Sequence, residues 1–208
     1  MSSRNGTTRR LVVITAGMSV PSSTRRLADR LAEAAGAALR ARGMRPEIEV
    51  VELRELAHEI TDHLLTGLPP GRLREVVGKV AAADGLIAVT PVFNASFSGL
   101  FKSFFDALDR DAVAGKPVLI GATGGSERHS LVLDHAMRPL FAYLHAIVAP
   151  TAVYAASADW GPARDGSPEL LERVERAGGE LADLVSGRLP ARRPDRDLVP
   201  FEELVSGG

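Results

Sequence analysis

The sequence contains no cysteine among its 208 residues. This absence excludes disulfide bonds, thiolate nucleophiles, iron–sulfur clusters and cysteine-based zinc sites together. An excess of charge of one sign is also missing, because 25 Lys and Arg residues stand against 26 Asp and Glu residues. A formal net charge of −1 provides no basic field for DNA or for an anionic membrane. We therefore expect neither nucleic acid nor a membrane among the partners.

Long apolar runs are missing as well. No stretch approaches the roughly 18 apolar residues of a membrane span, and the run after the basic N-terminus is too short for a signal peptide. The sequence therefore predicts a cytoplasmic protein. It has no H-E-x-x-H or comparable metal pattern and no G-x-S-x-G elbow, so we predict no metal site and no serine hydrolase.

Short β-branched runs alternate with longer amphipathic segments along the chain. Leu11–Thr15 is typical of a buried strand, and apolar residues recur at helical spacing from Thr24 to Arg42. Five strands alternating with five helices predict a flavodoxin-like three-layer α/β/α fold with a five-stranded parallel sheet of order 2-1-3-4-5. The other predicted strands are Ile48–Leu53, Leu86–Thr90, Val118–Ala122 and Ile147–Ala155, the last interrupted at Pro150.

The chain is expected to form one domain at residues 11–187. A flexible N-terminus at 1–10 precedes this domain, and a tail rich in proline and arginine follows it at 188–208. The tail carries one apolar patch, and two interpretations of it remain open: an extension over a partner subunit, or disorder. The patch consists of Leu198, Val199, Phe201 and Leu204.

Ligands of such folds bind beyond the carboxyl ends of the strands, which directs attention to three loops. The loop at 16–24 leads directly into a helix, whose N-terminus attracts anions. It lacks both the P-loop pattern and the dinucleotide glycine pattern, which excludes a triphosphate P-loop. Its hydroxyl side chains either hold a terminal phosphate or cap the helix. These residues are Ser19, Ser22, Ser23 and Thr24.

The other two loops follow the strands that end at Thr90 and Ala122. Phe93 and Phe97 lie among small residues at 90–99, which suits a flat heteroaromatic ring, although both rings could instead anchor the loop in the core. The glycine pair at 124–125 either lets the backbone approach a ligand closely or forms an ordinary turn. All three loops lie at one edge of the predicted sheet, which favours a shared binding site.

Two motifs resemble the NAD(P)H-dependent FMN reductase family. They read T-P-V-F-N-A-S-F-S-G-L-F-K-S-F-F-D and A-T-G-G-S-E-R-H-S-L-V-L-D-H-A-M-R-P-L, and the similarity covers roughly residues 10 to 155. The sequence is most similar to flavin reductases that serve luciferase-like two-component monooxygenases. The resemblance implies hydride transfer from NAD(P)H to FMN, a monooxygenase partner, and a homodimer or homotetramer. It implies no catalytic acid, base or nucleophile, because the two cofactors carry the chemistry.

The resemblance also assigns residues to the FMN site. Met18 and Val20 stand where many relatives have a loop arginine, and we expect Arg25 or Arg26 to substitute. Ser19, Ser22, Ser23 and Thr24 would hold the phosphate; Pro91, Val92, Phe93, Asn94 and Ala95 would line the isoalloxazine; and Gly124, Gly125 and Ser126 would contact its other side.

The roles of two other residues, and two other functions, stay open at the level of the sequence. His129 is the only histidine in a site loop, and it either touches the ligand or lies at the surface. Lys102 either neutralises reduced flavin, contacts the phosphate of NAD(P)H, or is a solvated helix lysine. An FMN-containing quinone, azo or chromate reductase differs from a flavin reductase in retaining its FMN. A flavodoxin-like electron carrier without catalysis is the third function, and a net charge of −1 weighs against it because flavodoxins are usually strongly acidic.

Overall fold

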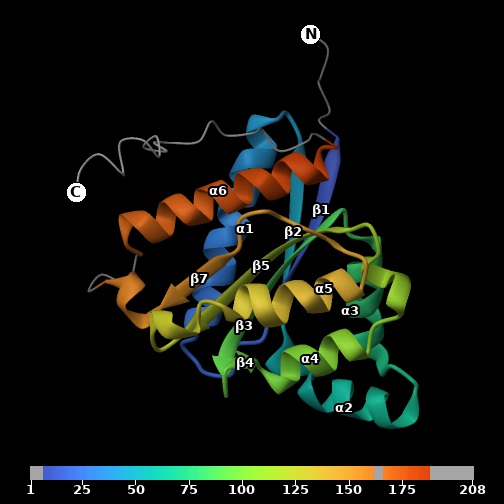
Figure 1. The fold of residues 1–208 in the computed structure, drawn as a ribbon. Helices are drawn as coiled ribbons and strands as arrows, with labels where there is room; N and C mark the ends of the chain where they lie inside the picture. The colour runs from blue at the N-terminus through green and yellow to red at the C-terminus, as the bar shows by residue number, and fades with distance from the viewer. Residues whose placement is uncertain (1–6, 162–165, 188–208) are drawn as a thin grey trace, which may run out of the picture.

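The computed structural model describes residues 7–161 and 166–187, with helices on both faces of a central sheet (Figure 1). Strand order is β2-β1-β3-β5-β6, and β7 also pairs with β5. This confirms the predicted flavodoxin-like order, with the fifth strand divided in two near Pro150. The parallel strands are β1 (Thr8–Thr15), β2 (Arg45–Glu52), β3 (Gly85–Phe93), β5 (Pro117–Gly124), β6 (Ile147–Val148) and β7 (Val153–Ala156).

The sheet differs from the prediction at two places. Thr8–Arg10, expected in a flexible N-terminus, pair with Arg45–Glu47 and lengthen β1. A short strand, β4 (Ser96–Phe97), pairs antiparallel with the end of β3. The sheet therefore has more strands than five and is not wholly parallel. The tail at 188–208 lies outside the described residues, so the interpretations of its apolar patch stay predictions.

One face of the sheet is covered by α1 (Ser23–Ala41) and α6 (Pro168–Val185), and the other by four helices. These four are α2 (Ala57–Thr66), α3 (Gly71–Ala82), α4 (Gly99–Asp106) and α5 (Arg138–Tyr143). Helix α2 was not predicted, and the helical segment between β5 and β6 consists of several pieces. The remaining short helices are η1 (Leu53–Leu56), η2 (Arg110–Val113), η3 (Glu127–His129), η4 (Leu133–Met137, a π-helix) and η5 (Ser157–Trp160).

Two hydrophobic cores lie on opposite faces of the sheet. Val12 and Ile14 of β1 belong to one core, and Leu11 and Val13 belong to the other. Burial on both faces explains why the strand is a continuous apolar run. On the α4 side, aromatic rings from α4 and α5 pack together. These rings are Phe101, Phe104, Phe105 and Phe141. No helix in the described ranges is long and apolar enough to span a membrane.

Candidate functional site

The carboxyl ends of three adjacent parallel strands place the three loops side by side. Thr15 of β1 pairs with Val89 of β3, and Pro91 of β3 pairs with Thr123 of β5. The loop after β1, the hairpin after β3 and the loop after β5 therefore begin at the same edge of the sheet. We call them the first, second and third loops.

The first loop is closed by the N-cap of α1. Ser22 Oγ accepts a hydrogen bond of 3.2 Å from the Arg25 amide, and it lies so close to Gly17 that a Cβ on Gly17 would overlap it. Ser19 Oγ donates to the Pro21 carbonyl at 3.1 Å, whereas Ser23 is exposed. Helical geometry leaves the first amides of α1 without intrahelical acceptors. The loop thus combines a capped helix start with donors at its surface.

Thr24 does not belong to the surface of the first loop. Its side chain is buried, and its hydroxyl lies 2.8 Å from the hydroxyl of Thr123 on β5. This contact joins the first turn of α1 to the strand that carries the third loop. Of the four hydroxyl residues predicted to hold a phosphate, Thr24 is therefore the one that the structure directs into the interior.

Charged side chains border a cavity of about 310 Å³ beside the first loop. Arg25 bonds to Asp29 at 2.8 Å and to Glu52 at 2.5 Å, and the hydrogen bond to Asp29 raises the pKa of Arg25. Arg54 Nε lies 2.8 Å from the same Glu52 carboxylate. The lining consists of Ser19, Val20, Pro21, Ser22, Arg25, Arg26, Asp29, Glu52 and Arg54.

The second loop is a tight hairpin between β3 and β4. Phe93 pairs with Ser96, and the two residues between them, Asn94 and Ala95, have φ values of 47° and 67°. Positive φ at both turn positions is typical of a type I′ turn. Phe93 at the tip is half exposed, whereas Phe97 is partly buried and its ring centroid lies 5.8 Å from that of a core phenylalanine. Phe97 anchors the hairpin, and Phe93 is presented at the edge.

A buried hydroxyl fixes the base of this hairpin. Thr90 Oγ1 accepts a hydrogen bond of 3.0 Å from the Ser98 amide and donates to the Pro91 carbonyl at 3.0 Å. Ser98 Oγ in turn caps α4. Further along α4, Lys102 forms an exposed ion pair of 2.6 Å with Asp106. This favours the solvated helix lysine over a lysine directed at a ligand.

Tyr154, to which the sequence pointed for no role, holds the third loop in place. Tyr154 of β7 is 8% exposed, and its hydroxyl donates to the Ser126 carbonyl at 2.7 Å. Burial raises the pKa of this phenol. A Cβ on Gly124 would overlap the same hydroxyl, whereas a Cβ on Gly125 would meet no atom within 4 Å. The first glycine thus accommodates the tyrosine, and the second is open to solvent.

The third loop borders a second cavity, of about 420 Å³, on the side of β7. His129 is exposed in η3, next to this cavity and not among its lining residues. The lining consists of Gly125, Ser126, Glu127, Arg128, Ala156 and Ala158.

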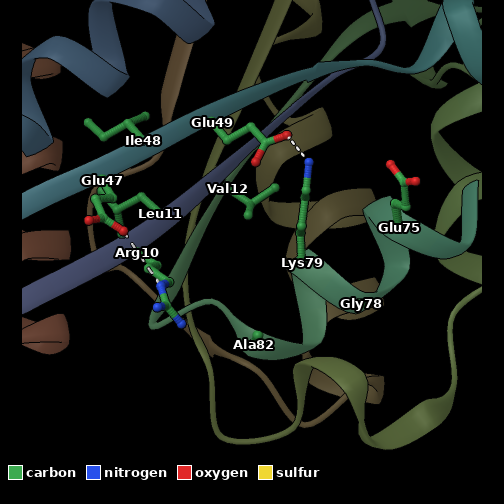
Figure 2. Close-up of a pocket in the computed structure, with 10 residues that line it drawn as sticks. All are labelled: Arg10, Leu11, Val12, Glu47, Ile48, Glu49, Glu75, Gly78, Lys79 and Ala82. Carbon is green, nitrogen blue, oxygen red and sulfur yellow. Dashed lines mark hydrogen bonds and ion pairs between the residues drawn. The ribbon is translucent and has the colours of Figure 1, made fainter. Parts of the chain in front are cut away.

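A cavity of about 610 Å³ lies elsewhere, against the amino-terminal halves of β1 and β2 and the end of α3 (Figure 2). Figure 2 shows that four of its five charged side chains form two pairs, with Glu75 as the fifth: Lys79 lies 2.6 Å from Glu49, and Arg10 lies 3.6 Å from Glu47. This cavity is remote from the carboxyl edge, and the paired charges leave little to recognise a ligand. The candidate site is therefore the edge formed by the three loops.

Comparison with known proteins finds a matching family and similar relatives for this chain. The model of the family described as NADPH-dependent FMN reductase matches residues 9–161. The chain is 41% identical to an FMN reductase (NADPH) of Pseudomonas aeruginosa over 67% of its length and 75% of the relative's. It is 36% identical to the NADH-dependent FMN reductase SfnE of Pseudomonas putida over 88% of its length and 96% of the relative's.

A solved structure agrees with these sequence matches. The crystal structure of an oxidoreductase from Corynebacterium diphtheriae is 48% identical, with a TM-score of 0.83 over 87% of this chain and 98% of that one. The family match covers all three loops and the strands that carry them. The chain therefore belongs to the NADPH-dependent FMN reductase family.

Proposed function

We propose that this protein transfers hydride from NAD(P)H to FMN at the edge formed by the three loops. The observation that carries the proposal is the meeting of a capped helix start, a half-exposed aromatic ring and an open glycine at the ends of β1, β3 and β5. The helix start fits a phosphate, and the aromatic ring and the open glycine fit a flat ring. The family match and the names of the relatives support FMN and a nicotinamide cofactor as the ligands.

The residues would divide the ligand between the loops. Ser19, Ser22 and Ser23, with the first amides of α1, would hold the phosphate, and Thr24 would support them from below. The hairpin residues 91–95 would line one side of the isoalloxazine, and Gly124, Gly125 and Ser126 would line the other. A bound flavin would supply the hydride acceptor, and these residues would hold and orient its ring. Amide N–H groups of the two loops would stabilise the negative charge that develops on the ring.

The reduced flavin would leave to supply a two-component, luciferase-like monooxygenase. The resemblance of the second and third loops to reductases of such systems supports this use. The exposure of Phe93 and Gly125 is consistent with a ligand that enters and leaves freely. A homodimer or homotetramer is proposed on the same resemblance. Met18 and Val20, both apolar and exposed in the first loop, would then be covered in the assembly.

The test is oxidation of NADPH and of NADH by FMN-stripped protein as free FMN is added. Saturable turnover, with reduced FMN recovered in the filtrate of a size-exclusion membrane, supports a reductase that releases its flavin. FMN that stays bound, with turnover only after a quinone or azo compound is added, contradicts flavin supply and favours a reductase of those acceptors. Bound FMN that neither nucleotide reduces contradicts both enzyme functions and leaves an electron carrier.

A further inference from the structure

Four of the charges around the first-loop cavity neutralise one another. Arg25 is shared between Asp29 and Glu52, and Glu52 also lies 2.8 Å from Arg54. Two cations and two anions therefore form a closed group with no net charge. The raised pKa of Arg25 reflects the same pairing. A guanidinium held by two carboxylates gains little from a further anion, because the two neighbouring negative charges already compensate its own.

Arg26, the fifth charged residue that lines the cavity, is held differently. Its guanidinium carbon lies 5.1 Å from the ring centroid of Trp160, and no carboxylate of the described residues forms an ion pair with it. Trp160 is 6% exposed, so its ring is a fixed surface. Stacking on an aromatic face orients a guanidinium and leaves the N–H groups at its edge free to donate. Arg26 is thus an oriented cation with unused donors.

The loop itself contributes no cation to the cavity. Its exposed side chains at positions 18 and 20 are Met and Val, so charge for a phosphate has to come from a neighbouring element. We infer that Arg26 supplies the charge that recognises the ligand phosphate, and that Trp160 is the positioning residue that holds Arg26. The inference rests on the proposed FMN site. It adds that the protein prefers FMN over riboflavin through this one arginine of α1.

The expected effects follow from the charges. FMN carries a phosphate with a charge between −1 and −2 at neutral pH, and riboflavin carries none. Loss of one hydrogen-bonded charge contact weakens binding by roughly tenfold or more. Arg26→Gln should therefore raise the Kd of FMN by roughly tenfold and leave that of riboflavin nearly unchanged. Added salt should reduce the FMN preference of the natural protein more than that of the variant.

The experiment measures equilibrium binding of FMN and of riboflavin by quenching of flavin fluorescence. The matched control is the double variant R25Q/D29N, which removes a neighbouring ion pair without changing the net charge. This control should keep the preference for FMN. R26K retains the charge without the planar stack and should give an intermediate preference. Circular dichroism and thermal unfolding identify any variant that fails to fold.

Trp160 is tested by W160L, with W160F as the variant that keeps a ring. The preference for FMN should fall toward that of R26Q in W160L and be largely retained in W160F. Equal losses of FMN and riboflavin binding in R26Q would overturn the inference, as would an unchanged FMN preference. Loss of the preference in R25Q/D29N would assign the role to Arg25. A natural protein that binds neither flavin would instead contradict the proposed function itself.

Discussion

Replacing Gly124 by alanine should destabilise the fold, although the change adds a single methyl group. A Cβ at this position would overlap the Tyr154 hydroxyl and lie 3.2 Å from its Cζ, so the ring has to move. The ring is buried, and moving it breaks the 2.7 Å hydrogen bond to the Ser126 carbonyl. A lost hydrogen bond costs about 1 kcal/mol, and overpacking typically costs about 1–3 kcal/mol. We expect the free energy of unfolding to fall by about 2–4 kcal/mol.

The neighbouring Gly125 provides the control. A Cβ there meets no atom within 4 Å, and its φ is not in the left-handed region, so Gly125→Ala should change the free energy of unfolding by less than about 0.5 kcal/mol. Because this glycine is proposed to contact the isoalloxazine, the same substitution should weaken FMN binding. Substitution of the first glycine should thus lower the stability of the fold, and substitution of the second should weaken ligand binding.

Urea denaturation tests the cause as well as the size of the effect. The four proteins compared are the natural protein, the two single variants Gly124→Ala and Tyr154→Phe, and the double variant. Gly124→Ala is compared in the natural background and in Tyr154→Phe, where the overlapping oxygen is gone. The methyl group should cost at least 1 kcal/mol less in the Phe background, a coupling of the size seen between residues in contact. Equal costs in both backgrounds would refute the reasoning. So would a Gly124→Ala variant as stable as the natural protein.

Three further predictions concern stability. In α6, Gly179→Ala should raise the free energy of unfolding by about 0.5–1 kcal/mol, because the added Cβ meets no atom within 4 Å. Gly178→Ala should lower the free energy of unfolding by about 1–3 kcal/mol, because its Cβ would lie 2.7 Å from a backbone amide of α1. Effects of the same sign in urea denaturation would contradict this. Ala95→Gly should raise the melting temperature, because the left-handed conformation of this residue costs alanine about 1–2 kcal/mol. The greater entropy that glycine gives the unfolded chain offsets only part of this gain. A lower melting temperature would contradict the prediction. Burial raises the pKa of Tyr154, so the folded state keeps a proton that the unfolded state loses near pH 10, and the free energy of unfolding should fall as pH rises above 10. Absorbance titration of Tyr143→Phe, which leaves Tyr154 as the only tyrosine, should give a midpoint above 10, and a midpoint at or below 10 would argue against it.

Much of the fold was predictable because its strands are buried on both faces. Such strands are short apolar runs, and the helices between them have a clear 3.6-residue period. Helix α2 escaped prediction although Leu56, Ile60 and Leu64 recur at helical spacing, and only Ile60 of its ten residues is buried. The end of β3 was not predicted because a proline usually interrupts a strand, yet Pro91 pairs with Thr123 at the carboxyl ends of β3 and β5.

The position of the site was predictable from the sequence, whereas the contacts of its individual residues were less so. Parallel topology brings the three loops together whatever their side chains are. The burial of Thr24 could have been found from helical phase, because Leu27, Ala28 and Leu31 of α1 occupy the same face. Tyr154 and Trp160 carried no such signal. Their contacts join residues far apart in the sequence, and such pairs appear only once the chain is folded.

The two edges of the sheet restrict how copies of this chain associate. At one edge, β2 has a single neighbour among the described strands, and its alternating side chains at 45–49 are charged. At the other edge, the break near Pro150 leaves β6 and β7 with two and four residues, too short to template a long added strand. Charged and interrupted edges both oppose strand-to-strand addition. Growth of the sheet from chain to chain is thus disfavoured on both sides, so a second subunit would contact the helical layers or the loops and would not extend the sheet.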